Sequence, residues 1–167
     1  MSLVNGLPAH VLLVHFVVVL VPLTAIAVVA SAVWPAVARR MGVVLPVLAL
    51  VTLASVPLTT SAGEWLEEHV GSNALVRRHA ELGDGLLPWA LGLFVLAAAV
   101  WWTTRRTTSE QTGNRSASVV RIAAAVLSVV VAAGAVVDVY RIGDSGAKAA
   151  WHDGYSKTAG GSGDGDD

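Results

Sequence analysis

The sequence contains no cysteine among its 167 residues. This absence excludes disulfide bonds, thiolate metal sites, iron–sulfur ligation and the covalent attachment of c-type haem. Charged residues are also scarce, at 14% of the chain against roughly 25% in an ordinary soluble protein. The formal net charge is -1, so the composition indicates no nucleic-acid partner and no general basic surface.

Familiar catalytic motifs are missing as well. The sequence has no G-x-S-x-G nucleophile elbow, no phosphate-binding Walker loop, no H-E-x-x-H zinc motif and no G-x-G-x-x-G after a strand. A hydrolase or a nucleotide-dependent enzyme is therefore not expected, and the sequence leaves any other enzymatic activity open.

Long apolar runs dominate what is present. Hydrophobic residues make up 54% of the chain, and a helix needs about 20 of them in succession to cross a bilayer. A transmembrane β-barrel would instead show alternating polarity. The runs are continuous, so they predict an all-α integral membrane four-helix bundle within residues 1–151. The expected helices cover about residues 10–34, 43–60, 86–102 and 119–140.

The distribution of charge predicts the orientation. Arginines concentrate in the connections 35–42 and 103–118, whereas acidic residues concentrate in an expected loop at 61–85 and in the tail. Short loops rich in Lys and Arg stay on the cytoplasmic side, so we expect a multi-pass protein of the cell (plasma or inner) membrane with both termini outside. No Lys or Arg precedes the first run, which favours a retained helix over a cleaved signal peptide. The acidic Gly/Ser/Asp tail, 152–167, is expected to be disordered.

All five histidines fall on the predicted outer side. Neutral imidazole is the commonest metal ligand in proteins, so this side is the candidate location of a metal site. His15 lies about one turn inside an apolar helix, where ionisable groups are costly and usually functional. It is either a site residue or an interfacial histidine that is hydrogen-bonded to a neighbouring carbonyl. His10 and His15 are some 140° apart around an ideal helix, so they converge only if His10 lies in a turn before the helix. We expect His69 and His152 to be solvated.

One further acidic residue, Asp138, lies near the end of the expected fourth helix. Arg141 follows it by three residues, a spacing that supports an ion pair on a helix surface. We therefore interpret Asp138 as structural.

Four stretches resemble the pattern of a family of prokaryotic membrane proteins called domain of unknown function 2231. They are GLPAHVLLVHF near the N-terminus, SVPLTTSAGEW in and after the second apolar run, HAELGDGLL before the third, and RIGDSGAKAAW after the fourth. The resemblance extends from Gly6 to Trp151.

This resemblance implies a set of site residues. Relatives place histidines at the positions of His10, His15, His79 and Asp144, and usually a proline at Val11. The implied metal site therefore has three histidines and one carboxylate. His15 and His79 are the principal cofactor ligands, and His10 and Asp144 are either further ligands or hydrogen-bond partners that orient the ligands. A metal ion or haem b is the implied cofactor, and the occurrence of relatives beside Rieske and cytochrome modules implies a redox-linked role.

Three functions are compatible with the sequence. The first is a membrane-embedded metal or haem site in electron transfer, since helical bundles commonly build such sites from facing side chains. The second is an accessory subunit that anchors a partner complex. The third is a small transporter or proton relay. The expected partners are the lipid bilayer and either a redox protein or a second copy of the chain.

Overall fold

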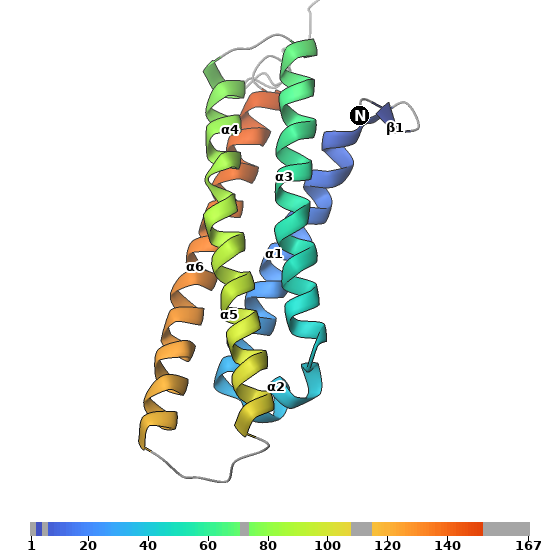
Figure 1. The fold of residues 1–167 in the computed structure, drawn as a ribbon. Helices are drawn as coiled ribbons and strands as arrows, with labels where there is room; N and C mark the ends of the chain where they lie inside the picture. The colour runs from blue at the N-terminus through green and yellow to red at the C-terminus, as the bar shows by residue number, and fades with distance from the viewer. Residues whose placement is uncertain (1–2, 5–6, 71–73, 108–114, 152–167) are drawn as a thin grey trace, which may run out of the picture.

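The computed structural model describes residues 3–4, 7–70, 74–107 and 115–151, and helices make up nearly all of this part (Figure 1). A two-residue antiparallel ladder precedes the first helix and pairs Val4 with Leu7. The elements are β1 (Leu3–Val4), β2 (Leu7–Pro8), α1 (Ala9–Val33), α2 (Pro35–Met41), α3 (Val44–Val70), α4 (Ala74–Asp84), α5 (Leu86–Thr107) and α6 (Arg115–Trp151).

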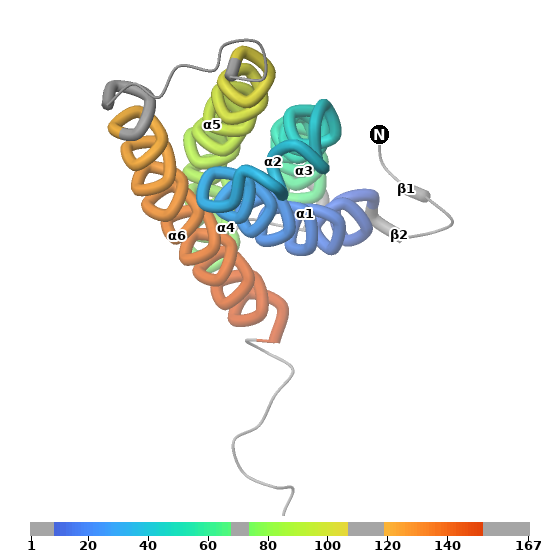
Figure 2. Tube along the Cα trace, turned by 90° about the horizontal axis from the view of Figure 1, so that it is seen from below, coloured from blue at the N-terminus to red at the C-terminus, as the bar shows by residue number. Residues whose placement is uncertain are grey.

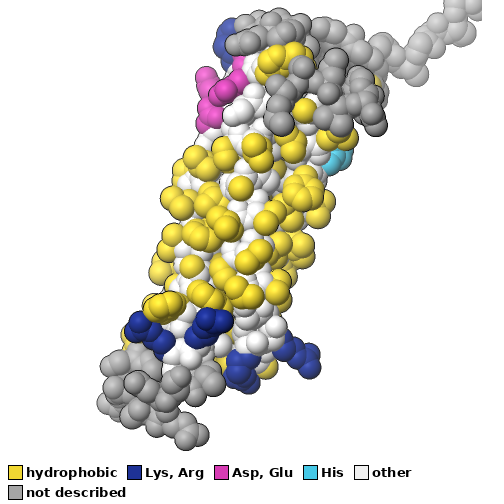
Figure 3. Space-filling view, turned by 45° about the vertical axis from the view of Figure 1, so that its right-hand side comes forward, with side chains coloured by type: hydrophobic (Ala, Val, Ile, Leu, Met, Phe, Trp, Pro, Cys, Tyr) yellow, Lys and Arg dark blue, Asp and Glu magenta, His cyan; other side chains and the backbone are white. Residues whose placement is uncertain are grey.

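Four stretches of helix are long and apolar enough to cross a membrane, which confirms the predicted all-α membrane bundle. They are Ala9–Val33, Val44–Glu67, Ala74–Arg106 and Val119–Trp151. Side chains such as Ile26, Val95 and Val126 point outward from them. Figure 3 shows the result as a broad hydrophobic band that separates a basic end of the bundle from an end with acidic side chains. A continuous apolar surface of this kind suits contact with lipid.

The long helices form a ring in the order α1, α3, α5 and α6, each packed against the next (Figure 2). α4 precedes α5 and packs against α6, while α2 lies across the opposite end of the bundle and contacts α1 and α5. We call the end that holds α4 and the start of α1 the histidine end. We call the end that holds α2 and the last turn of α5 the arginine end.

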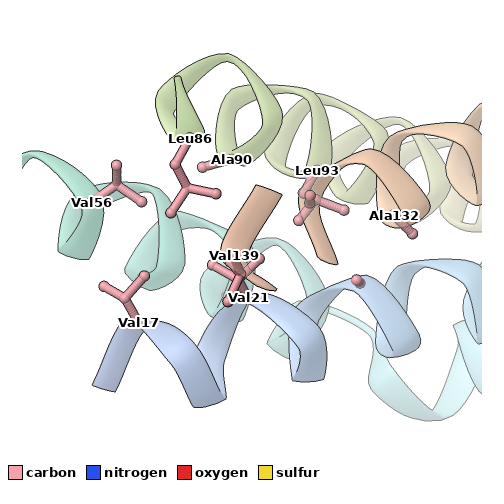
Figure 4. Packing of buried hydrophobic residues seen from close by; sticks show 10 residues of the cluster. Val17, Val21, Val56, Leu86, Ala90, Leu93, Ala132 and Val139 are labelled. Atoms are coloured by element: carbon pink, nitrogen blue, oxygen red, sulfur yellow. The ribbon is translucent and has the colours of Figure 1, made fainter. Parts of the chain in front are cut away.

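Two clusters of small and branched side chains fill the bundle. The cluster nearer the histidine end brings Val21, Leu93 and Val139 together from three helices (Figure 4). The other, nearer the arginine end, is built around Val28 and Leu45. Alanines and glycines let the helix backbones approach closely, as is usual in membranes. At Gly134, for example, a side chain would overlap the ring of Trp89.

A polar contact joins α1 and α3 inside the bundle. The hydroxyls of Thr24 and Thr52 are 2.7 Å apart and fully buried. Thr52 Oγ1 also donates to the carbonyl of Leu48 at 2.9 Å. A hydroxyl has one proton, so Thr24 is the donor to Thr52. The pair therefore forms a directed chain of hydrogen bonds from α1 to the backbone of α3.

The polar segment after the second apolar run differs from the prediction. The expected loop at 61–85 is wrong, because α3 continues to Val70 and α4 occupies most of the remainder. α6 likewise continues past residue 140 to Trp151. Hydropathy detects only the part of a helix that crosses lipid, whereas Ala, Leu, Glu and Arg favour helix in water too. The predicted disordered tail, 152–167, lies outside the described residues.

The first predicted connection, 35–42, contains the short helix α2. Pro35 occupies its first turn, where a missing N–H removes no helical hydrogen bond. Gly42 ends it with a φ of 51°, a conformation that side chains disfavour. This helix places Arg39 and Arg40 at the arginine end.

Candidate functional site

His10 lies in the first turn of α1 and reaches across to α3. Its Nδ1 atom is 3.0 Å from the carbonyl oxygen of Thr59. One turn further along α3, Gly63 supports the ring: a Cβ atom there would stand 3.0 Å from His10 Cε1 and Nδ1. The absence of a side chain at Gly63 is therefore what makes room for the imidazole.

His79 is held in a similar way between α4 and α6. Its Nδ1 atom lies 3.1 Å from the carbonyl oxygen of Ile142 and 3.0 Å from Ser145 Oγ. Ser145 in turn donates its hydroxyl to the same carbonyl at 2.8 Å. A Cβ atom at Gly146 would stand 2.9 Å from His79 Cε1. Each of the two histidines thus combines a carbonyl partner with a supporting glycine on a neighbouring helix.

The two imidazoles meet at the histidine end. Their ring centroids are 6.2 Å apart and their planes are nearly perpendicular, at 89°. A carbonyl oxygen can only accept a hydrogen bond, so Nδ1 carries the proton in both rings. In the neutral imidazole the lone pair is then on Nε2. The His10–His79 pair therefore presents two Nε2 atoms of the same, backbone-determined tautomer.

The other two predicted site residues have separate partners. His15 is exposed, and its Nδ1 donates to the carbonyl of Val11, one turn earlier in α1, at 2.6 Å. Asp144 is exposed and pairs with Lys148 at 2.6 Å, on the surface of α6. Across residues 3–4, 7–70, 74–107 and 115–151, no three His, Asp or Glu side chains gather in a group that could hold a metal ion. Of the four predicted residues, the structure brings His10 and His79 together.

The remaining predictions concern His69, His152 and Asp138. His69 belongs to α3, and His152 lies outside the described residues. Arg141 does not come within ion-pairing distance of Asp138, although its charge acts on that carboxylate. Lys148–Asp144 is the ion pair that the described residues form. Asp138 Oδ2 is buried and has no hydrogen-bond partner among the described residues. It lies 3.7 Å from where a Cβ atom of Gly85 would stand.

Sequence reasoning missed the residues that position the imidazoles. Thr59 and Gly63 hold His10, while Ser145 and Gly146 hold His79. All four lie in the stretches SVPLTTSAGEW and RIGDSGAKAAW. Glycines inside these two stretches were the available signal, because a glycine in a helix costs stability and often marks a close approach.

Each of the four stretches that carry the family resemblance contributes to the His10–His79 pair. The first supplies His10, the third supplies His79, and the other two supply the carbonyls and glycines around them. A family profile described as a predicted membrane protein, DUF2231, matches residues 6–159, which is most of the chain. The chain belongs to the DUF2231 family.

The description of DUF2231 specifies a membrane protein and no activity. No curated protein matches the chain, and no solved structure matches it. The histidine pair, the buried oxygen of Asp138 and the arginine end are the features that bear on the function of this DUF2231 member.

Proposed function

We propose that this multi-pass membrane protein binds a metal ion through His10 and His79, in a redox-linked role. The proposal is carried by one hydrogen bond in each histidine. His10 Nδ1 donates to the carbonyl of Thr59, and His79 Nδ1 donates to the carbonyl of Ile142. Metal-ligating histidines almost always donate their other ring N–H in this way, because it fixes the tautomer and makes Nε2 more basic. Imidazole nitrogen suits zinc, copper, iron and nickel.

The spacing of the rings supports the same proposal. A metal–nitrogen bond is roughly 2 Å long, so two imidazoles on opposite sides of one ion have centroids about 6 Å apart. His10 and His79 have centroids 6.2 Å apart. This separation is compatible with two imidazoles on one ion, provided that both Nε2 atoms face it.

His15 and Asp144 remain the proposed additional ligands. His15 has the same tautomer as the pair, with its Nδ1 donating to Val11. Asp144 lies one residue before Ser145 and two before Gly146, so it is close along α6 to the residues that hold His79. Lys148 pairs with one of the two oxygens of Asp144, and an exposed surface pair of this kind has little energetic value, so it does not prevent the carboxylate from binding a metal.

A haem b group between His15 and His79, or between His10 and His79, is the alternative form of the cofactor. Iron accepts two imidazole nitrogens, and bundle cores commonly hold such groups on facing helices. The redox-linked role itself rests on the family resemblance. An absorption spectrum separates the two forms, because haem has a strong Soret band and a simple metal ion has none.

The test is a metal titration of the purified, metal-stripped protein in detergent. Zinc and copper(II) are added in separate calorimetric titrations, and bound metal is counted by elemental analysis. We expect about one ion per chain, with binding weakened at least tenfold in His10→Ala and in His79→Ala. His152→Ala is the matched control and should bind normally. Absence of both stoichiometric metal and haem, or equal affinity in all three variants, would refute the proposal.

Proton relay is the second candidate, and Asp138 is the observation that favours it. Asp138 is half-buried, and among the described residues its Oδ2 atom has no hydrogen-bond partner. Ionisable groups in membrane helices are costly and usually functional. In liposomes with a pH gradient, a relay predicts proton flux that Asp138→Asn abolishes. Flux that is absent, or unchanged in the variant, rejects this candidate.

A further inference from the structure

Four arginines gather at the arginine end of the bundle. Arg39 and Arg40 lie in the last turn of α2, and Arg105 and Arg106 lie in the last turn of α5. All four side chains are exposed. α2 and α5 pack against each other, so the two pairs belong to one surface rather than to separate loops. Figure 3 shows basic side chains grouped at this end, directly beyond the hydrophobic band.

Two of these arginines are stacked on tryptophan rings. The guanidinium carbon of Arg105 is 4.4 Å from the centroid of the Trp101 ring, and that of Arg106 is 4.7 Å from the centroid of the Trp102 ring. A guanidinium held over an indole face is attracted by the ring electrons. Its N–H groups lie at the edge of its plane and remain available to an anion in a fork that matches phosphate.

The positive charge of this surface is not neutralised by the described residues. Lys148–Asp144, on α6, is the ion pair that the described part of the chain forms, so none of the four arginines has a carboxylate within pairing distance there. Trp102 is exposed. Tryptophan prefers the level of the lipid headgroups, so the stacked arginines stand where headgroup phosphates lie.

We propose that the arginine end binds the headgroups of anionic phospholipids. The occupant is a lipid because the charged surface borders the membrane-facing band and carries its aromatic residues at the junction. Basic clusters beside transmembrane helices attract anionic lipid, with roughly a fivefold preference for each arginine or lysine. The proposal stands independently of the metal site, since the two lie at opposite ends of the bundle.

The test counts bound lipids. Purified protein in detergent is incubated with equal amounts of phosphatidylglycerol and phosphatidylcholine. Native mass spectrometry then records which lipids the protein retains. We expect at least tenfold enrichment of phosphatidylglycerol. The double variant Arg105→Gln/Arg106→Gln should reduce the enrichment at least fivefold, and so should Arg39→Gln/Arg40→Gln.

The matched control is Arg77→Gln/Arg78→Gln. These adjacent, exposed arginines of α4 lie at the histidine end, so their replacement removes the same charge from the opposite side of the bundle. The control should keep the enrichment. Equal retention of the two lipids by the unmodified protein would overturn the proposal. An equal loss of enrichment in the control would also overturn it.

Discussion

At the scale of single residues, the histidine end depends on two glycines as much as on its two histidines. His79 touches the backbone of α6 because Gly146 has no side chain, and His10 touches α3 because Gly63 has none. The carbonyls of Thr59 and Ile142 then determine which ring nitrogen carries the proton. Exchange of one hydrogen atom for a methyl group should therefore disturb the site without disturbing the bundle.

Gly146→Ala tests this directly. The new Cβ atom would stand 2.9 Å from His79 Cε1, closer than real Cβ atoms approach, so the ring must move. We expect metal affinity to fall about tenfold, the lower end of what lost support for a ligand costs. The measurement is the calorimetric titration described above.

Gly143→Ala is the control for that variant. It lies on the same helix, and a Cβ atom there meets no atom of the described residues within 4 Å. Both changes raise helix propensity equally, so any difference between them comes from the contact with His79. Equal affinities in the two variants would show that the position of this ring does not matter for binding.

At the scale of helices, the sequence predicts the membrane-crossing parts and misses what lies beyond them. The apolar run at 43–60 is continuous enough to define a crossing, yet α3 continues to Val70 through a polar segment that hydropathy cannot assign. Hydropathy also misses α4, because its charged residues make this segment too polar to be recognised as a membrane-crossing helix. The helix-favouring residues of both segments are a weak local signal, and the packing against neighbouring helices that stabilises them is not local in sequence.

For a related reason, the sequence does not predict that His10 and His79 lie next to each other. His10 and His79 are far apart in sequence, and they meet only because α1 packs on α3 and α6 while α4 packs on α6. The family resemblance did select both residues. It also selected His15 and Asp144, which the same packing leaves with other partners.

The hydrogen bond between α1 and α3 offers a measure of how strongly these helices are joined. In a double-mutant cycle of Thr24→Val and Thr52→Val, we expect a coupling energy of about 0.6 kcal/mol, typical of buried hydrogen bonds in membrane bundles. Unfolding of the detergent-solubilised protein supplies the four free energies. Zero coupling would mean that each hydroxyl finds another partner when the other is removed.

At the scale of the whole molecule, the two ends of the bundle differ in chemistry. One carries paired imidazoles and the Glu and Asp residues of α4, and the other carries exposed arginines on α2 and α5. Four crossings place the start of α1 and the end of α6 at the same end. The positive-inside rule then predicts that the histidine end faces outward.

The absence of cysteine makes this orientation simple to test. Glu81→Cys introduces one exposed thiol at the histidine end, and Ala36→Cys introduces one at the arginine end. On intact cells a membrane-impermeant maleimide should label Glu81→Cys, and should label Ala36→Cys only after the cells are made permeable. The reverse pattern would place the termini inside.

The position of the histidine pair has a thermodynamic consequence for the whole bundle. His10 belongs to α1 and His79 to α4, so anything bound by both rings cross-links segments that are distant in the chain. Such a ligand binds the folded state and not the separated helices, and at one hundred times its dissociation constant it would raise the unfolding free energy by about 2.7 kcal/mol. Resistance to heat would therefore report the natural ligand, so that candidate ions and cofactors can be ranked by melting temperature alone.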